Sequence, residues 1–387
     1  MNKPQYIERI LDLKSLIKNK SHILLGPRQV GKTLLIKHQL PKVKNYNLLL
    51  LEDFKRLSFD PTLIRKEIKK EDKIIVIDEI QKLPTLLDEV QFLIEEKNIH
   101  FLLTGSSARR LRKQNTNLLG GRARLLKLNP FIKRELKEKF DLDKVIQHGL
   151  IPSIYLSDDP EQDLDSYIGL YLEQEIANEG LSRNLPSFAR FLEVASLCHG
   201  EQINYSSVSS DTEIPRTTIH EYFRILEDTL IGFLLEPWNE GKKRKPIKTP
   251  KFYFFDWGIV KKLQGLQKIS KKSQIFGKAF ESYLFHEIKT YCDYSKINKL
   301  NYWRTQQQDE VDFIINDSIA VEIKSGEQIK KSDLKGLIRL HEENLIKDFY
   351  LVYSGKDLVI ESYPWIKILN YSNFLDALWD GEVTTHL

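Results

Sequence analysis

Short apolar runs alternate with amphipathic stretches through the first third of the chain. SHILL at residues 21–25, IIVI at 74–77 and IHFLL at 99–103 are almost uninterrupted apolar runs. Runs of this kind are typical of parallel strands that are buried on both faces. We therefore expect residues 1–135 to form an α/β domain with a central parallel sheet.

The pattern changes to a helical period in the middle of the chain. DLDSYIGLYLEQEIANEG at residues 163–180 has apolar residues at spacings of three and four, which predicts a helix. Three further helices are expected over residues 188–200, from about Tyr205, and over 214–231. Strands at 232–238 and 251–260 follow, which gives the element order of a winged helix. We assign residues 136–187 to a helical linker and 188–268 to a winged-helix domain.

The loop between these two strands, GKKRKPIKTPK at residues 241–251, is strongly basic. As a wing it would suit contacts with nucleic-acid phosphates. The alternatives are a solvated lysine loop and a protein-binding winged helix, and both stay open. The basic residues of this loop are Lys242, Lys243, Arg244, Lys245, Lys248 and Lys251.

The last third reads as a second α/β domain, residues 269–387. A helix is expected over residues 276–292, and VDFIINDSIAVEIKSG at 311–326 predicts two strands joined by a turn at Asn316 and Asp317. Residues 348–355 predict a further strand. The hairpin is unusual because charged residues interrupt its apolar runs.

The segment GPRQVGKT at residues 26–33 is a P-loop placed between a predicted strand and a predicted helix. Its glycines let backbone N–H groups point at phosphate oxygens, and the following helix N-terminus adds a favourable dipole. Lys32 would reach the β- and γ-phosphates of ATP, and the Thr33 hydroxyl would hold Mg²⁺. The loop residues expected to bind the nucleotide are Gly26, Pro27, Arg28, Gln29, Val30, Gly31, Lys32 and Thr33.

Two acids end the second apolar strand, in KIIVIDEIQKLP at residues 73–84. Asp78 would lie near Mg²⁺, and Glu79 would polarise the attacking water. A plain helix cap is the alternative for this pair. At the end of the third strand, Thr104, Ser106 or Ser107 could contact the γ-phosphate or its water, with plain turn residues as the alternative. Arg122, with Arg124 as the alternative, would reach the nucleotide of a neighbouring subunit, which requires a homo-oligomer.

The charges of the C-terminal hairpin also form a pattern. Glu322 and Lys324 are two residues apart in one strand, so they share a face, and Asp312 on the antiparallel neighbour can reach the same place. Two carboxylates that meet there would repel unless a cation lay between them. Mg²⁺, with Mn²⁺ as an alternative, accepts such oxygen ligands, and Lys324 could help to deprotonate a water. The alternative is an ion-paired hairpin without metal.

The motifs GPRQVGKT, IIVIDEIQKLP, LLTGSSARRL and GGRARLLKLNPF together resemble prokaryotic AAA-type ATPases whose C-terminal half is a domain of unknown function. The resemblance implies a RecA-like ATPase core, a winged helix and a nuclease-like fold. The C-terminal pattern resembles PD-(D/E)xK (restriction-endonuclease-like) nucleases, which carries Glu281, Asp312 and Glu322 onto metal ligands and Lys324 onto the catalytic lysine. The Ile323 carbonyl would be a further ligand. No proline precedes Asp312, where the motif's name has one.

Composition sets wider limits. The 387 residues are 41% hydrophobic, and no run of about 18 apolar residues predicts a membrane span. The two cysteines, Cys198 and Cys292, are far apart, which excludes a paired-cysteine zinc framework and fits a cytoplasmic protein. A net charge of +5 permits nucleic-acid binding without demonstrating it.

These observations favour an ATP-hydrolysing AAA-type ATPase coupled to a Mg²⁺-dependent endonuclease-like domain that acts on nucleic acid, expected to be DNA. The alternative is an ATPase switch whose nuclease-like fold is catalytically silent and binds DNA or a partner protein. A DNA-binding transcription regulator is the weaker third option, because the candidate recognition helix has few basic residues, Arg216 and Arg224.

Overall fold

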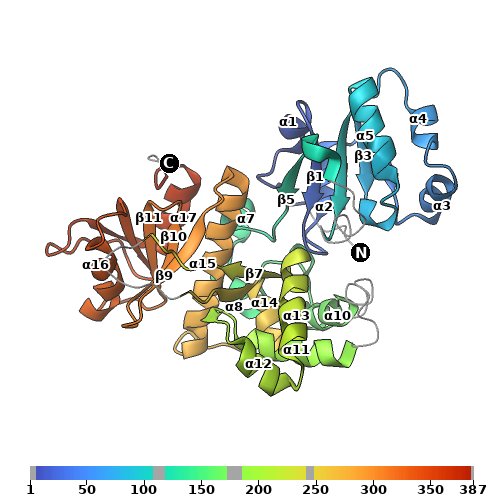
Figure 1. Ribbon diagram of the computed structural model, residues 1–387. Helices are drawn as coiled ribbons and strands as arrows, with labels where there is room; N and C mark the ends of the chain where they lie inside the picture. The colour runs from blue at the N-terminus through green and yellow to red at the C-terminus, as the bar shows by residue number, and fades with distance from the viewer. Residues whose placement is uncertain (1–5, 108–117, 172–184, 241–247, 385–387) are drawn as a thin grey trace. The chain divides into compact units, whose positions relative to one another are not determined.

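The structure is a computed structural model that describes residues 6–107, 118–171, 185–240 and 248–384 (Figure 1). Internal contacts divide the chain into two compact units. Unit 1 comprises Met1–Phe131, Ile151–Leu156 and Phe223–Ile231, and unit 2 comprises Ile132–Leu150, Ser157–Tyr222 and Gly232–Leu387. This division differs from the four segments expected from the sequence, whose boundaries stay predictions.

Unit 1 contains a five-stranded sheet in which every neighbouring pair of strands is parallel. The strand order is β2-β3-β4-β1-β5, so β4 lies between the strand before the P-loop and the strand that ends in Asp78. The prediction of an α/β domain with a central parallel sheet is confirmed. The strands are β1 (Ser21–Leu25), β2 (Lys44–Asn47), β3 (Ile74–Asp78), β4 (His100–Gly105) and β5 (Ala123–Lys127).

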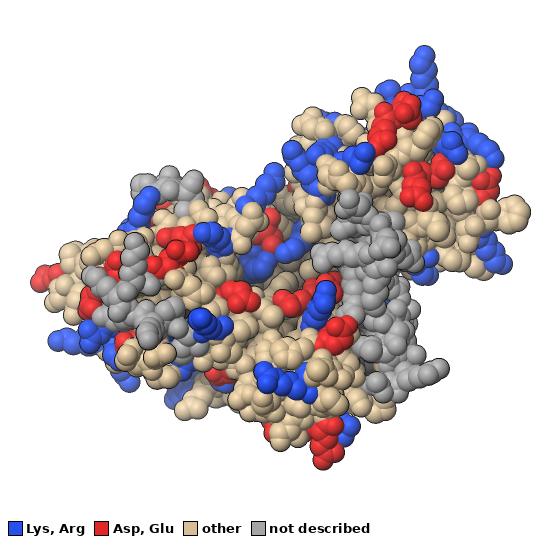
Figure 2. Space-filling view, viewed as in Figure 1, with Lys and Arg blue, Asp and Glu red and all other residues tan. Residues whose placement is uncertain are grey.

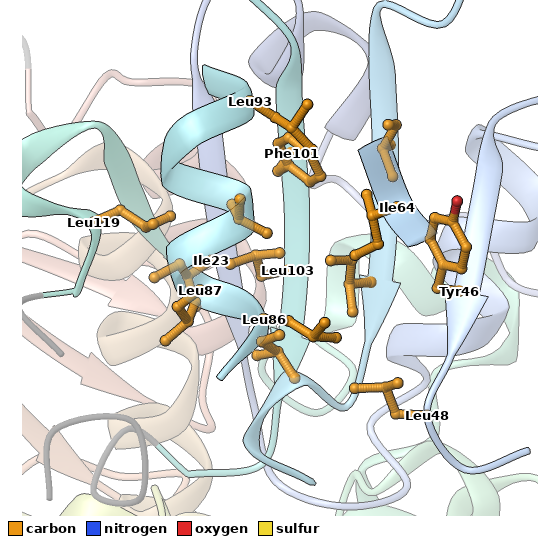
Figure 3. Packing of buried hydrophobic residues seen from close by; sticks show 14 of the residues in the cluster. Ile23, Tyr46, Leu48, Ile64, Leu86, Leu87, Leu93, Phe101, Leu103 and Leu119 are labelled. Atoms are coloured by element: carbon orange, nitrogen blue, oxygen red, sulfur yellow. The ribbon is translucent and has the colours of Figure 1, made fainter. Parts of the chain in front are cut away.

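The helices of unit 1 bury apolar stripes against this sheet. Helix α5 places Leu86, Val90 and Leu93 on one face, at the spacing of successive helical turns. They pack with Phe101 and Leu103 of β4 in the hydrophobic core (Figure 3). The helices are α1 (Leu13–Ile17), α2 (Lys32–Gln39), α3 (Leu51–Phe59), α4 (Leu63–Glu67), α5 (Leu86–Lys97) and α9 (Pro152–Tyr155).

The middle of the chain forms helices and a small antiparallel sheet of order β6-β8-β7. The helices expected near residues 188, 205 and 214 are present as α11, α12 and α13. The winged-helix assignment stays a prediction. The elements are α7 (Lys133–Leu136), α8 (Leu142–His148), α10 (Pro160–Tyr171), α11 (Leu185–Leu197), β6 (Glu201–Gln202), α12 (Tyr205–Thr212), α13 (Arg216–Asp228), β7 (Gly232–Leu235), β8 (Lys251–Phe254) and α14 (Trp257–Leu263).

The strand expected over residues 251–260 is too long. Strand β8 ends at Phe254, and α14 begins at Trp257. The Asp256 side chain ends the strand because it accepts a hydrogen bond of 2.8 Å from the Gly258 N–H and caps the helix. Gly258 is required there, since a Cβ atom would lie 2.3 Å from the His148 carbonyl oxygen.

The C-terminal part of unit 2 is a mixed five-stranded sheet of order β13-β12-β11-β10-β9. The predicted hairpin is confirmed as antiparallel β10 and β11, and its turn residues Asn316 and Asp317 both have positive φ, as a type I′ turn requires. The PD-(D/E)xK fold stays a prediction. The elements are α15 (Gln274–Ser295), β9 (Leu300–Arg304), β10 (Glu310–Ile315), β11 (Ile319–Lys324), α16 (Lys335–His341), β12 (Asp348–Tyr353), β13 (Ile366–Asn370) and α17 (Tyr371–Trp379).

On the face shown in Figure 2, Lys and Arg side chains are interspersed with Asp and Glu over both units. This agrees with the small net charge of the chain. Within the described ranges, no helix is both long and apolar enough to cross a bilayer.

Helix α15 carries a fully buried acid, Glu287, which makes the stability of unit 2 depend on pH. Burial raises the Glu287 pKa to about 7, although the Lys133 N–H donates a hydrogen bond of 2.6 Å to the carboxylate. A carboxyl whose pKa is higher in the folded state disfavours folding once it ionises. The penalty is absent below the ordinary pKa near 4.5, grows between about pH 4.5 and 7, and is complete above that range.

We expect Glu287→Gln to stabilise unit 2 at pH 8 by up to about 3 kcal/mol and to have little effect at pH 4.5. Glutamine keeps an acceptor for the Lys133 N–H and cannot ionise. All five tryptophans lie between residues 238 and 379, so urea unfolding followed by tryptophan fluorescence reports on unit 2. Glu361→Gln, at an exposed position, is the control. Equal stabilisation at both pH values would contradict the explanation.

Candidate functional site

The P-loop joins β1 to α2. Close packing at one of its positions and positive φ values at two others restrict which residues the loop can contain. Gly26 packs so closely that a Cβ atom would lie 2.4 Å from the Leu128 carbonyl oxygen. Gln29 and Gly31 have φ values of 62° and 94°, in the left-handed region. Alternation of this kind turns successive N–H groups toward one concave side, which is the geometry of an anion-binding nest.

Lys32 begins α2, and its side chain is 7% exposed. Its ammonium donates hydrogen bonds of 2.6 Å to the Gly26 carbonyl and 2.9 Å to the Pro27 carbonyl. The charge is therefore held over the loop by neutral acceptors. Phosphate oxygens are stronger acceptors for an ammonium than carbonyls, so a nucleotide could take their place.

Asp78 lies at the end of β3 and is completely buried. Thr33 donates a hydrogen bond of 2.9 Å to its Oδ2 atom, and the Thr104 hydroxyl donates to Oδ1. The structure thus brings Thr33 and Asp78 together across 45 residues of sequence, with Thr104 on the intervening strand.

Glu79 has a φ of 64°, an uncommon conformation for a residue with a side chain. Its N–H donates a hydrogen bond of 3.0 Å to the Thr104 hydroxyl. Its carboxylate accepts a short hydrogen bond from the Gln81 amide, which also lies 3.4 Å from the Ser106 hydroxyl. Gln81 therefore connects two predicted site residues. This role of Gln81 was not predicted from the sequence, although Gln81 follows Glu79 by only two positions.

Arg9 is a second residue that the sequence analysis missed. It is 6% exposed, and its guanidinium donates hydrogen bonds of 2.8 Å to the Val30 carbonyl and 2.5 Å to the Asn129 carbonyl. It thereby fixes the P-loop backbone to the segment after β5. A lone arginine 120 residues away from its partner carries no sequence signal for this role.

The two candidate arginines lie near the edge strand β5. Arg122 forms an ion pair with Glu95 of the same chain and donates to the Leu119 carbonyl, whereas Arg124 is exposed. Their action on a neighbouring subunit stays a prediction. Arg28 is half-buried within the P-loop.

The hairpin acids meet on neighbouring strands of unit 2. Phe313 and Val321 are paired across the two strands, and Asp312 lies one position before Phe313 while Glu322 lies one position after Val321, so their side chains leave the sheet on the same side. They are 9% and 7% exposed. The Ile323 N–H donates a hydrogen bond of 2.8 Å to Asp312, and the Lys324 ammonium donates to one oxygen of Glu322.

The electrostatics agree with this convergence. Burial raises the pKa of the Glu322 carboxyl well above its usual range, and the Asp312 charge adds to the shift. Burial also raises the Asp312 pKa, against the opposing effect of Lys324. The buried Oε2 atom of Glu322 has no hydrogen-bond partner among the described residues. An unpaired carboxylate oxygen beside a second acid is a fitting ligand for a hard divalent cation.

Glu281 of α15 lies close enough to Asp312 to feel its charge, and it has a hydrogen-bond partner of its own. Burial raises the Glu281 pKa to about 7, and the charge of Asp312 adds to the shift. The Tyr253 hydroxyl donates a hydrogen bond of 2.6 Å to its carboxylate. Among the described residues, no three His, Cys, Asp or Glu side chains gather closely enough to hold a metal ion as they stand. The three-carboxylate metal site stays a prediction.

Lys251 was expected both as the last basic residue of the wing and as the first residue of a strand, and the structure places it in the strand. Lys251 belongs to β8, is 3% exposed and forms an ion pair with Glu310. The acids that stabilise its buried charge, Glu281, Glu310 and Asp312, are distant in the sequence. The basic residues before Lys251 therefore gave no sign that it is buried. Lys242, Lys243, Arg244 and Lys245 lie outside the described residues.

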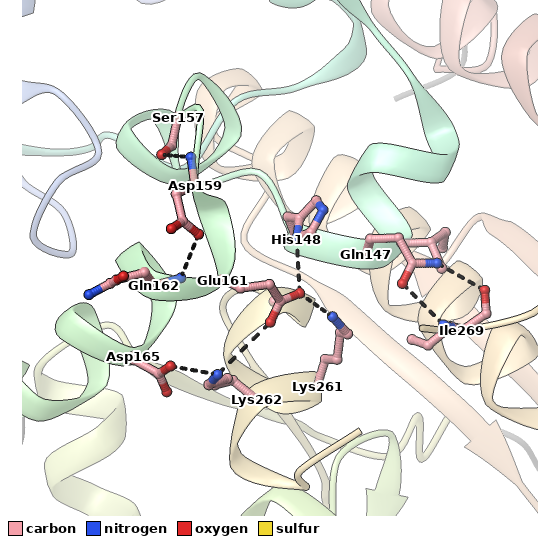
Figure 4. Close-up of polar contacts among 12 residues, drawn as sticks. Gln147, His148, Ser157, Asp159, Glu161, Gln162, Asp165, Lys261, Lys262 and Ile269 are labelled. Atoms are coloured by element: carbon pink, nitrogen blue, oxygen red, sulfur yellow. Dashed lines mark hydrogen bonds and ion pairs between the residues drawn. The ribbon is translucent and has the colours of Figure 1, made fainter. Parts of the chain in front are cut away.

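A separate pocket of about 540 Å³ lies beside α8, α10 and α14. Glu161 accepts a hydrogen bond of 2.5 Å from the buried ammonium of Lys261, and it lies 3.3 Å from His148 and 3.9 Å from Lys262 (Figure 4). Lys262 also forms an ion pair of 2.7 Å with Asp165, so both Lys261 and Lys262 have carboxylate partners within the protein.

Three domain families match successive parts of the chain. Residues 18–137 match an AAA domain. Residues 139–270 and 276–372 match two domains of unknown function, DUF8612 and DUF4143. Neither of the later two families assigns an activity.

Relatives with similar sequences extend over most of the chain. An uncharacterized protein of Mycobacterium tuberculosis is 27% identical over 350 residues, which cover 86% of this chain and 76% of that protein. An uncharacterized protein of Haemophilus influenzae is 22% identical over 320 residues, which cover 74% of this chain and 78% of that protein.

Solved structures resemble the chain only weakly. The ORC1 protein of Aeropyrum pernix in complex with DNA covers 63% of this chain and 86% of its own, at 13% identity and a TM-score of 0.22. Domain III of the replication initiation protein DnaA from Thermotoga maritima covers 54% and 84%, at 13% identity and the same TM-score. Scores this low do not establish a common overall fold. The parallel sheet, the P-loop and the AAA match together identify residues 18–137 as an AAA-type ATPase domain.

Proposed function

We propose that this protein hydrolyses ATP in unit 1 and couples that reaction to metal-dependent cleavage of nucleic acid by the acid cluster of unit 2. The observation that carries the second half is the meeting of Asp312, Glu322 and Lys324 on one hairpin, with one carboxylate oxygen of Glu322 unpaired. DNA is the expected substrate.

For ATP hydrolysis, the nest of the P-loop would hold the phosphates, and Lys32 would turn from its loop carbonyls to the β- and γ-phosphates. Mg²⁺ would enter with the nucleotide, held by Thr33 and Asp78, and would neutralise phosphate charge. Glu79 would orient a water whose oxygen attacks the γ-phosphorus. The bond to the bridging oxygen breaks, ADP leaves, and the water's proton passes to Glu79 or to the released phosphate.

For phosphodiester cleavage, Asp312 and Glu322 would hold Mg²⁺ or Mn²⁺, which lowers the pKa of a bound water and polarises the phosphate. The Ile323 carbonyl is a further candidate ligand. Lys324 would move from Glu322 toward the phosphate, stabilise its developing charge and orient the attacking water. Water supplies the new P–O bond, and the 3′ or 5′ oxygen leaves with a proton.

The second candidate function is an ATPase switch with a silent nuclease-like domain. It is favoured by the internal pairing of the cluster, because Lys324 already occupies one oxygen of Glu322, a carboxylate that a metal would need. In both candidates the predicted winged helix would bind DNA or a partner protein, and Arg122 or Arg124 would act in a homo-oligomer.

The central experiment measures ATP turnover and plasmid cleavage by the full chain, with Mg²⁺ or with a chelator, in the presence and absence of ATP. We expect Lys32→Ala to reduce ATP turnover by about 10²-fold, because the variant lacks the charge that meets the transferred phosphoryl group. If the two activities are coupled, ATP will change the cleavage rate of the wild type and not that of the variant.

Lys37→Ala is the matched control, since Lys37 lies on the same helix and is exposed. ATP turnover that survives Lys32→Ala would contradict the assigned P-loop role. Metal-dependent cleavage that ignores ATP in the wild type would separate the two activities. Cleavage should also be compared on plasmid DNA, single-stranded DNA and RNA, because the acid cluster alone does not distinguish them.

A further inference from the structure

Strand β8 lies outside the predicted nuclease-like domain, yet it supplies two side chains to the acid cluster. Lys251 and Tyr253 are two residues apart, so they project from the same face of the strand. Lys251 forms an ion pair with Glu310 of β10, and the Tyr253 hydroxyl donates a hydrogen bond of 2.6 Å to Glu281 of α15. The acid cluster consists of Glu281, Glu310, Asp312 and Glu322. Side chains of β8 therefore bind two of these four acids, Glu281 and Glu310.

The Lys251 ammonium is buried deeply enough to need charged partners. Its side chain is 4% exposed, and the Tyr302 ring lies beneath it with the centroid 5.3 Å from Nζ. Burial alone disfavours the ammonium, but the carboxylates of Glu281, Glu310 and Asp312 outweigh burial and raise its pKa above the usual value. Removing one partner from such a group leaves uncompensated charge in the interior.

The acids differ in what remains available to a ligand. Glu281 has Tyr253 and the nearby Lys251 charge, and Glu310 has both Lys251 and Arg304, the latter at 2.9 Å. Glu322, in contrast, keeps one buried oxygen without a hydrogen-bond partner. Glu281 and Glu310 thus lie beside a resident cation, whereas Glu322 keeps an oxygen that a ligand could use.

We propose that Lys251 is the resident cation of the acid cluster. It neutralises Glu281 and Glu310, keeps them out of metal coordination, and confines a divalent cation to Asp312 and Glu322. The part that concerns the metal rests on the proposed function, whereas the ion pair of Lys251 with Glu310 and the nearness of its charge to Glu281 do not. Glu281 then acts as a positioning residue that links α15 to β8.

The pairing is tested without metal by thermal unfolding of the full chain in a chelator, followed by tryptophan fluorescence from unit 2. We expect Lys251→Met to lower the unfolding midpoint by about 10 °C, because Glu281 and Glu310 are left without their cation. The triple variant Lys251→Met, Glu281→Gln, Glu310→Gln should recover at least about half of that loss. A triple variant no more stable than Lys251→Met would overturn the proposal.

The metal part is tested by Mn²⁺ titration calorimetry of the same proteins without nucleotide. We expect Lys251→Met to bind one more Mn²⁺ per chain than the wild type, since a second cation can then enter between Glu281 and Glu310. Lys261→Met, which removes another buried lysine paired with an acid, should bind the same number as the wild type. Glu281→Gln should leave Mn²⁺ affinity within about threefold, and Asp312→Asn should lower it at least about tenfold.

The two arms separate the two proposals. Equal losses of Mn²⁺ affinity in Glu281→Gln and Asp312→Asn, with no extra ion in Lys251→Met, would make Glu281 a ligand and overturn the confinement of the metal. If no variant and no wild type bound Mn²⁺ in unit 2, the nuclease proposal would fail. In that case, recovery by the triple variant in the chelator would still support Lys251 as the cation of the cluster.

Discussion

Replacing Glu79 with glutamine is expected to lower ATP turnover by about 10²–10⁴-fold while ATP binding changes only a few-fold. The backbone at Glu79 is fixed by the Thr104 hydroxyl and by a positive φ, so the substitution should leave the P-loop in place. Glutamine can still accept the hydrogen bond from Gln81, but it cannot take a proton from water. Steady-state phosphate release and equilibrium binding of a fluorescent ATP analogue measure the two effects separately.

Glu89→Gln provides the matched control for this variant. Glu89 lies on α5 and pairs with Arg65, so the same chemical change there should alter turnover by less than about twofold. If Glu79→Gln kept more than about a tenth of the wild-type rate, the group that activates water would have to be another residue. A parallel loss of ATP binding would instead indicate damage to the P-loop.

The parts of the site that could be predicted from sequence are those written in short contiguous patterns. The P-loop combines two glycines and a lysine within eight residues, and Asp78 and Glu79 end a strand that is apolar throughout. Each pattern determines a local structure. Because the strands are parallel, the carboxyl ends of the strands before the P-loop and before Glu79 then lie at the same edge of the sheet. The turn at Asn316 and Asp317 is similar, because both residues tolerate positive φ.

The residues that were missed act through contacts between distant segments. Arg9 reaches carbonyls 21 and 120 residues away, and no local pattern marks a residue as the donor to a particular backbone oxygen. The burial of Lys251 was not predicted for a related reason. Lys251 ends a basic loop and begins an expected strand, and its ion-pair partner Glu310 lies 59 residues further on, so no local pattern marks the pair.

In the C-terminal hairpin, one feature could be predicted from the sequence and another could not. Strand parity correctly predicted that Glu322 and Lys324 share a face and that Asp312 can join them. Parity does not determine how the side chains pair when several acids and cations compete. The resemblance to nucleases grouped Glu281 with the metal ligands, while the folded protein gives it a hydroxyl partner from β8.

Asp312→Asn is expected to reduce metal-dependent cleavage by about 10²-fold or more without lowering the stability of unit 2. The loss follows because a missing carboxylate ligand removes several kcal/mol of interaction with the metal. Stability should be maintained because asparagine still offers an oxygen to the Ile323 N–H. The substitution also removes a charge that raises the Glu322 pKa. Plasmid nicking with Mg²⁺ and urea unfolding followed by tryptophan fluorescence measure the two effects on the same preparation.

Asp317→Asn is the control, because Asp317 lies in the turn of the same hairpin and binds Lys299 and the Trp238 indole N–H instead of the acid cluster. It should cleave like the wild type even if it unfolds more easily. A lower unfolding midpoint in Asp312→Asn would indicate that lost activity reflects lost structure. Cleavage that is the same in Asp312→Asn and the wild type, or absent from both, would exclude this hairpin as the catalytic centre. The silent fold controlled by an ATPase would then explain why Lys324 and Lys251 pair so closely with the acids.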